Sequence, residues 1–285
     1  MSVSLPQHAA ALGLVTADIL LRAIRTRCLL PVPFFRTLAI NTCGDALAAV
    51  TPGRVGGDPI RYVGFRRLGA PGPSILALFG LEIAADAVVL FGVGALLAIV
   101  FKPAMEELLA ASGRLVRTSG FWLVLAATIA LAAGSVVLTR RWMPRALASL
   151  AVSLREAWRW ARAQTAGILV LTTVLTLLSL VARGAILPVL LANSGGLSAG
   201  TVILGSAVLV YGQLLAPTPA GIGAVELGAV VSLAGHFPLG DLPALLLIWR
   251  GYTLVLGAVV GAVLLVREGL ARRLITAVRG TNDSG

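Results

Sequence analysis

The sequence predicts an all-α, polytopic membrane protein with about six to eight membrane segments. The chain is 58% hydrophobic and 12% charged, with a mean hydropathy of +0.95, whereas about a quarter of the residues in a soluble domain are charged. Its clearest apolar stretches reach or approach the ~20 residues that cross a bilayer as a helix. They are residues 74–101, 121–139, 166–192 and 242–266. We therefore expect residues 1–285 to form a single integral membrane domain.

A short pattern, T-P-x-x-[V/I]-G, occurs twice and interrupts an apolar stretch each time. The copies are residues 51–56 and 218–223, and a carboxylate follows each within three residues, Asp58 and Glu226. Proline and glycine break helices. A break at membrane depth is tolerated where the freed backbone groups are buried in protein or line a wet cavity. Paired breaks in two halves of a membrane protein are typical of a transporter-type binding site.

The positive charge of the chain is almost all arginine, and the formal net charge is +11. The arginines gather at the ends of apolar segments, in residues 22–36, 61–67, 140–162 and 267–279. This distribution indicates cytoplasmic loops rather than a nucleic-acid partner. It predicts a multi-pass protein of the plasma (inner) membrane with a cytoplasmic C-terminus.

Counting crossings between these clusters predicts two pseudo-symmetric, inverted halves. The first spans about residues 9–139 and the second about 166–268; an amphipathic interfacial segment, 140–165, separates them, and a basic tail, 269–285, follows. Each half contains a Pro/Gly-broken segment, expected as a re-entrant hairpin; two tilted crossings are the alternative for residues 200–237. Residues 9–21 are expected to be a short segment with the N-terminus outside, and a helix missing from before this chain would explain that placement.

Several ionisable residues fall inside apolar segments, where each costs at least ~2.5 kcal/mol on insertion scales. Glu82 and Asp86 share one helix face, and Arg183 and Arg250 lie within later helices. A cation site, a proton-linked step and arginine partners are all compatible with the two carboxylates. The structural alternative pairs Glu82 or Asp86 with Arg54, Arg183 or Arg250.

The chain shows no pattern expected of an enzyme. It has two cysteines and two histidines, and no Ser/His, Cys/His or H-E-x-x-H constellation that would supply a nucleophile with its base or a metal site. We expect no catalytic residue, no metal and no cofactor.

At the two breaks the sequence resembles the flippase-like transmembrane family of lysylphosphatidylglycerol synthase. The signature P-G-R-x-G-[GE]-[DE], with an arginine shortly after, matches residues 52–58 and Arg61. The signature P-x-P-G-G-x-G-x-x-E matches residues 217–226, with Ala220 in place of a common glycine. An E-R-x-x-D-like element matches Glu82 and Asp86, with Ile83 in place of the arginine, and a late arginine matches Arg250. The likeness covers about residues 10–268.

The resemblance implies movement of a phospholipid or isoprenoid-linked lipid between leaflets, through a polar midplane site at the two breaks. Arginine forks and helix N-termini can bind a lipid phosphate there. The expected binding residues are Pro52, Gly53, Arg54, Gly56, Gly57, Asp58, Arg61, Glu82, Asp86, Pro217, Thr218, Pro219, Gly221, Gly223, Glu226 and Arg250. The alternative is an accessory membrane subunit of a lipid-modifying glycosyl- or aminoacyltransferase, with that enzyme as its partner. Cargo, direction, energy source and oligomeric state are not specified by the sequence.

Overall fold

The computed structural model is helical, and no β-strand occurs in the residues that it describes. These are residues 3–51, 56–106, 110, 144–193, 197–216, 218–233, 237–238 and 240–267. The earlier helices are α1 (Leu5–Leu29), α2 (Phe34–Val50), α3 (Gly57–Arg67), α4 (Gly72–Val100) and α7 (Pro144–Arg162). The later ones are α8 (Ala166–Gly184), α9 (Ile186–Leu191), α10 (Ala199–Leu215), η2 (Pro219–Gly221), α11 (Ala224–Leu233), α12 (Leu242–Arg250), the π-helical turn η3 (Gly251–Val255) and α13 (Leu256–Arg267).

Three continuous helical stretches are long and apolar enough to cross a membrane. They are Gly72–Val100, Ala166–Leu191 and Leu242–Leu264. These confirm three of the four predicted spans, and the fourth, 121–139, lies outside the described residues. The third span contains η3, where the helix widens to π geometry within an otherwise apolar run.

The first helix is much longer than the expected segment 9–21, which was wrong in its extent. Helix α1 begins with a capping box. The Gln7 side chain accepts a hydrogen bond from the Ser4 backbone N–H, the Ser4 side chain accepts that of Gln7, and Pro6 lies in the first turn. It has 25 residues and is therefore about 37 Å long at 1.5 Å per residue. Its charged residues hide this length from a hydropathy profile, because they lower the average of any window that contains them.

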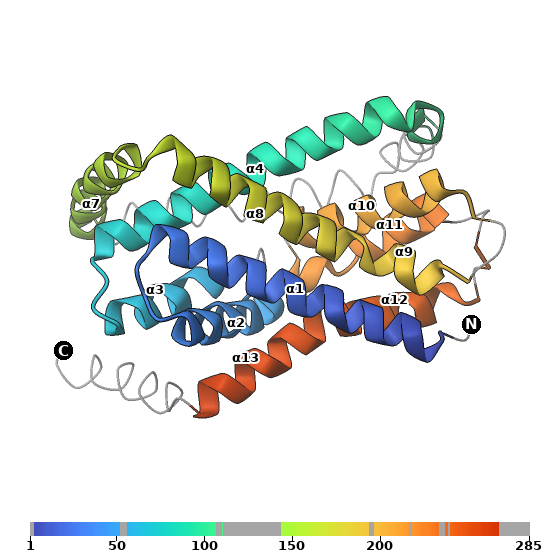
Figure 1. Ribbon diagram of the computed structural model, residues 1–285, viewed down its shortest axis with the longest axis horizontal. Coiled ribbons are helices and arrows are strands. Elements are labelled where there is room, and N and C mark those ends of the chain that lie inside the picture. The colour runs from blue at the N-terminus through green and yellow to red at the C-terminus, as the bar shows by residue number, and fades with distance from the viewer. Residues whose placement is uncertain are drawn as a thin grey trace.

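Two hairpins of packed helices flank the predicted break regions, one toward each end of the long axis (Figure 1). Helices α2 and α3 pack against each other on either side of the first break, and α10 packs against α11 across the second. The tip of the second hairpin, η2, also contacts α2, the first arm of the other hairpin. Helix α13 packs along α2, so the last part of the described chain covers the first hairpin.

Two apolar clusters fill the ends of the helix bundle. One includes Ala11 and Val15 of α1 with residues of α9 to α12, among them the fully buried Trp249. The other includes Leu29 with residues of α2, α3 and α4, such as Phe65. Helix α1 runs through both clusters and is packed along α8 (Figure 1). The stretch of α1 between the two clusters is polar, and it carries the candidate site.

Helix α7 lies within residues 140–165, where an amphipathic interfacial helix was expected. It packs against α4 at one end of the molecule. Ala157 is buried, whereas Trp158 is exposed, with the guanidinium of Arg162 4.7 Å above its ring. Such a combination of exposed aromatic and basic side chains is typical of a helix in the membrane interface.

Candidate functional site

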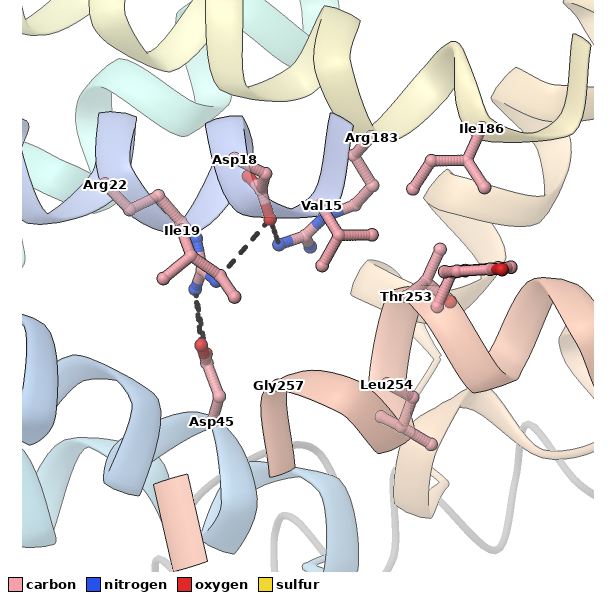
Figure 2. A pocket seen from close by; sticks show the side chains of 11 residues that line it. Val15, Asp18, Ile19, Arg22, Asp45, Arg183, Ile186, Thr253, Leu254 and Gly257 are labelled. Atoms are coloured by element: carbon pink, nitrogen blue, oxygen red, sulfur yellow. Dashed lines mark hydrogen bonds and ion pairs between the residues drawn. The ribbon is translucent and has the colours of Figure 1, made fainter. Parts of the chain in front are cut away.

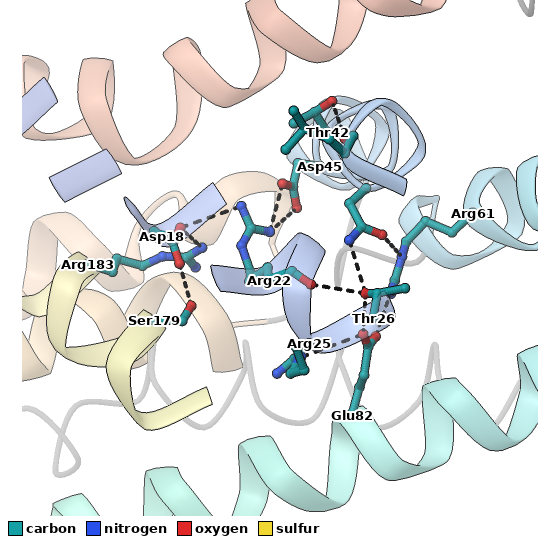
Figure 3. A network of polar contacts seen from close by, with 12 residues as sticks. Asp18, Arg22, Arg25, Thr26, Thr42, Asp45, Arg61, Glu82, Ser179 and Arg183 are labelled. Carbon is teal, nitrogen blue, oxygen red and sulfur yellow. Dashed lines mark hydrogen bonds and ion pairs between the residues drawn. The ribbon is translucent and has the colours of Figure 1, made fainter. Parts of the chain in front are cut away.

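The polar stretch of α1 places four side chains on one helix face. Arg22 follows Asp18 by four residues, and Arg25 and Thr26 follow Arg22 by three and four, so all four lie on neighbouring parts of one helix face. Asp18, Arg25 and Thr26 are buried. Hydrophobic packing cannot satisfy these groups, so each finds its partner on another helix. Figure 3 shows the resulting network.

One part of the network joins α1 to α8 and α2. The Oδ2 of Asp18 accepts a hydrogen bond from Nη2 of Arg183 at 2.8 Å, and its Oδ1 accepts one from the Ser179 hydroxyl at 2.5 Å. Arg22 forms an ion pair with Asp45 of α2 at 2.7 Å. Since Arg22 also lies 3.5 Å from Asp18, charges of alternating sign connect three helices (Figure 3).

The other part of the network centres on Glu82 of α4. Its Oε2 accepts a hydrogen bond from Nη2 of Arg61 at 2.6 Å, and its Oε1 accepts one from the Thr26 hydroxyl at 2.9 Å. Arg61 also donates through Nε to Asn41 at 3.1 Å, and its Cζ lies 4.8 Å from the centre of the Phe79 ring. A buried carboxylate is thus fully enclosed by donors, as burial of a charge requires.

Arg25 connects Glu82 to the second carboxylate of α4. Its Nη1 donates to Asp86 at 2.6 Å and to the Thr176 hydroxyl of α8 at 2.9 Å. Its Nε lies 3.6 Å from Glu82. The prediction that Glu82 and Asp86 face the same side of α4 is therefore confirmed, and α1 provides the arginine between them.

A cleft opens beside the first part of the network (Figure 2). It is small, with a volume of about 20 Å³, which is room for about one water molecule. Asp18, Arg22, Asp45 and Arg183 contribute charged groups to its wall, and the π-helical turn η3 contributes Tyr252, Thr253 and Leu254. π-Helical turns occur frequently at functional sites. The cleft therefore brings polar groups of α1, α2 and α8 to the wall of one small space beside η3.

A separate charged pair follows the second helix break. The Oε1 of Glu226, in the first turn of α11, lies 2.7 Å from Nη2 of Arg250 at the end of α12. The Oε2 of Glu226 accepts the backbone N–H of Gly223 at 2.7 Å. The preceding turn, η2, has left-handed backbone at Ala220 (φ 53°) and Gly221 (φ 68°). This geometry agrees with the predicted break.

The structure brings the predicted site residues together in two groups. Asp58, Arg61, Glu82 and Asp86 belong to the network, in which Asp58 lies 3.3 Å from Arg61. The second group surrounds the η2 turn and comprises Thr218, Pro219, Gly221, Gly223, Glu226 and Arg250. Gly56 and Gly57 lie at the start of α3, where a Cβ on Gly57 would come within 3.0 Å of the Gly44 carbonyl oxygen. Pro52, Gly53, Arg54 and Pro217 lie outside the described residues.

Two expectations about charge are wrong. Glu82 and Asp86 pair with Arg61 and Arg25, not with Arg183 or Arg250 as the structural alternative proposed. Arg22 and Arg25, which were expected in a cytoplasmic loop, lie within helix α1 and turn their side chains onto Asp45 and Asp86. The physical reason is that α1 continues to Leu29, which places these arginines within the bundle.

Sequence reasoning missed the polar face of α8. Thr172, Thr176, Ser179 and Arg183 repeat at intervals of four, three and four residues, and the first three are buried. A polar stripe with helical periodicity inside an apolar span is a signal that was available. On α1, Arg22 and Arg25 continue the same intervals from Asp18, but these two arginines were interpreted as a topology signal.

The fold and the site define an integral membrane protein of helices with a buried charged layer. The chain belongs to the lysylphosphatidylglycerol synthase TM region family, whose model matches residues 1–261. Membership indicates an integral membrane protein involved in lipid modification or transport. Comparison with curated proteins and with solved structures gives no match.

Proposed function

We propose that this protein moves a phospholipid or an isoprenoid-linked lipid between the two leaflets of the membrane. The observation that carries the proposal is the buried charged network between the two apolar clusters. Ionisable groups inside a membrane domain are expensive and mark pathways for polar or charged cargo. The headgroup would pass along these side chains while the tails remain in hydrocarbon. The proposal includes no catalytic residue, metal or cofactor.

The arrangement of the hairpins supports a pathway that is open in turn to each side. The hairpins occupy opposite ends of the long axis, and η2 contacts α2 (Figure 1). Each break is followed by a carboxylate in the first turn of the next helix, Asp58 in α3 and Glu226 in α11. We therefore propose six to eight membrane segments in two inverted halves, in the plasma membrane, with the basic C-terminus in the cytoplasm.

A reconstitution experiment tests the proposed transport. Purified full-length protein is placed in liposomes with fluorescent phosphatidylglycerol, phosphatidylcholine or a polyprenyl phosphate, and chemical quenching from outside reports movement between leaflets. We expect the wild type to move at least one of these lipids. We expect the double variant Arg61→Met/Glu82→Met to be inactive while remaining folded, because replacing both members of a buried ion pair by apolar residues is often neutral for stability.

The matched control for this assay is Arg159→Gln, which removes an exposed arginine of α7. It should move lipid at the wild-type rate. Equal rates for the wild type, the double variant and empty liposomes, with folded protein verified, would overturn the transport proposal.

A second candidate function is that of an accessory membrane subunit. Helix α7 presents exposed Trp158 and Arg162 at one end of the molecule, where a glycosyl- or aminoacyltransferase could dock. An obligate subunit co-purifies with its enzyme in a fixed ratio, so affinity purification from the native membrane separates this function from autonomous transport.

A further inference from the structure

The carboxylates that contact the buried arginines differ sharply in exposure. Glu82 and Asp18 are enclosed, with side chains 5% and 7% exposed. Three other carboxylates are about half exposed although their arginine partners are buried or nearly so. They are Asp86 on Arg25 (48% exposed), Asp58 on Arg61 (58%) and Glu226 on Arg250 (47%). The enclosed carboxylates hold the helices together, whereas the half-exposed ones can leave their arginines toward solvent or headgroups.

The groups around the Glu226 carboxylate are ones that bind anions. Its carboxylate accepts one hydrogen bond from the N–H of Gly223 and contacts the guanidinium of Arg250, both at 2.7 Å. A backbone N–H before a helix and an arginine fork are the two donors that bind phosphate. Space exists beside them, since a Cβ on Gly223 would meet nothing within 4 Å. The Nε of Arg250 is buried without a hydrogen-bond partner, so this arginine has an unused donor.

The first half of the chain repeats this arrangement. Asp58 lies in the first turn of α3 as Glu226 lies in the first turn of α11, and Arg61 holds it at 3.3 Å. Between the two halves, Arg25 holds Asp86, and the Nε of Arg25 is likewise buried without a hydrogen-bond partner. Three arginines on different helices thus each combine strong burial with a displaceable carboxylate.

We propose that Asp58, Asp86 and Glu226 are resident counter-ions, and that the phosphate of an anionic headgroup displaces them from Arg61, Arg25 and Arg250. The identification of that phosphate with a lipid rests on the proposed function. Together with Glu82, which stays paired with Arg61 and lies 3.6 Å from Arg25, these carboxylates keep the arginines neutralised when no ligand is bound, since an uncompensated buried charge is strongly destabilising. Exchange of one anion for another lets a phosphate enter without stripping a buried arginine of its counter-ion. A cationic headgroup would require the opposite arrangement, with the carboxylates as its ligands.

The test is a binding measurement on the full-length protein in detergent, so it does not depend on transport. The probes are short-chain phosphatidylglycerol, short-chain phosphatidylcholine and inorganic phosphate, with affinity read by native mass spectrometry and by the ligand-induced rise in melting temperature. The variants are Asp58→Asn, Asp86→Asn and Glu226→Gln. The controls are Glu156→Gln, an exposed carboxylate of α7, and Asp86→Glu, which keeps the charge.

We expect each neutral variant to bind phosphatidylglycerol about two- to fivefold more tightly, the range that corresponds to removing an ion pair with one exposed partner. Each should also melt lower than the wild type without ligand and recover more when the lipid is added. Both controls should bind as the wild type does. A gain for phosphatidylglycerol but not for inorganic phosphate identifies a lipid as the source of the phosphate, and an equal gain for both identifies a free-phosphate site.

Weaker binding by the neutral variants, or unchanged affinity in all three, would overturn counter-ion exchange. Failure of the transport assay with the expected binding gains would overturn the proposed function and leave this inference standing. Transport by the wild type with no change in binding among the variants would overturn counter-ion exchange and leave the proposed function standing.

Discussion

The Nη2 of Arg61 lies 2.6 Å from the Oε2 of Glu82, and this buried pair fastens the helix after the first break to the longest apolar helix. Truncating one partner leaves the other as an uncompensated buried charge. We expect Glu82→Gln to lower the free energy of unfolding by about 3–5 kcal/mol. Unfolding of the purified protein by denaturant in detergent measures the change.

The double variant Arg61→Met/Glu82→Met is the control for that prediction. Because it removes both charges, it should lose much less stability than Glu82→Gln. A double variant with a lower free energy of unfolding than Glu82→Gln would contradict this prediction. It would mean that the ion pair itself stabilises the protein more than apolar side chains in its place.

A second prediction concerns the contact between α13 and α2. A Cβ on Gly261 would overlap the Thr42 carbonyl oxygen and lie 2.9 Å from the Cys43 nitrogen, both backbone atoms that cannot move aside cheaply. Gly261→Ala should therefore destabilise the protein by about 1–3 kcal/mol. A thermal melt in detergent checks this.

Gly257, one turn earlier on α13, offers a matched control, since a Cβ there would meet nothing within 4 Å. We expect Gly257→Ala to be neutral or slightly stabilising, as alanine is the better helix former by about 1 kcal/mol. Equal losses for the two variants would mean that helix flexibility, and not close packing, explains the effect at Gly261.

The η2 turn predicts opposite effects at adjacent residues. Ala220 is buried with φ of 53°, a left-handed conformation that disfavours any residue with a Cβ, so Ala220→Gly should stabilise the protein by about 0.5–1 kcal/mol. Gly221 has φ of 68°, and a Cβ there would lie 2.7 Å from the Gln213 Cα. Gly221→Ala should destabilise it. Melting temperatures that shift in the same direction would contradict the turn geometry.

The proposed inverted arrangement of the two hairpins predicts which residues are labelled from which side of the membrane. Pro31 precedes α2 and Ser198 precedes α10, and both are exposed. In a variant without Cys28 and Cys43, a membrane-impermeant maleimide should reach Pro31→Cys from the cytoplasmic side and Ser198→Cys from the outer side. Labelling of both from one side would contradict the inverted arrangement, and labelling of each in detergent provides the accessibility control.

The sequence alone was sufficient for the features that depend on one segment. Long apolar runs located α4, α8 and the α12–α13 span, and the paired T-P motifs located both breaks. The four-residue spacing between Glu82 and Asp86 also predicted that these two carboxylates share one face of α4. Each of these follows from helical periodicity or from the backbone chemistry of proline and glycine.

The features that depend on partners from distant segments were not predictable in the same way. Arg22 and Arg25 were interpreted as the boundary of a cytoplasmic loop. A hydropathy scale assigns each arginine the same free-energy cost of insertion, whatever that arginine contacts in the folded protein. Asp45, Glu82 and Asp86 remove much of that penalty only once α2 and α4 are in place. The pairing of Asp18 was equally out of reach, since its partners Ser179 and Arg183 are more than 160 residues away.

The same separation sets an order of events during synthesis. Helix α1 leaves the ribosome with Asp18, Arg22 and Arg25 unpaired, and each such residue costs about 2.5–3.5 kcal/mol at the centre of an inserting helix. Asp45 follows soon, but Arg183 is made 165 residues after Asp18. We therefore expect α1 to reach its final place only after α8 has been translated, although it is made well before α8.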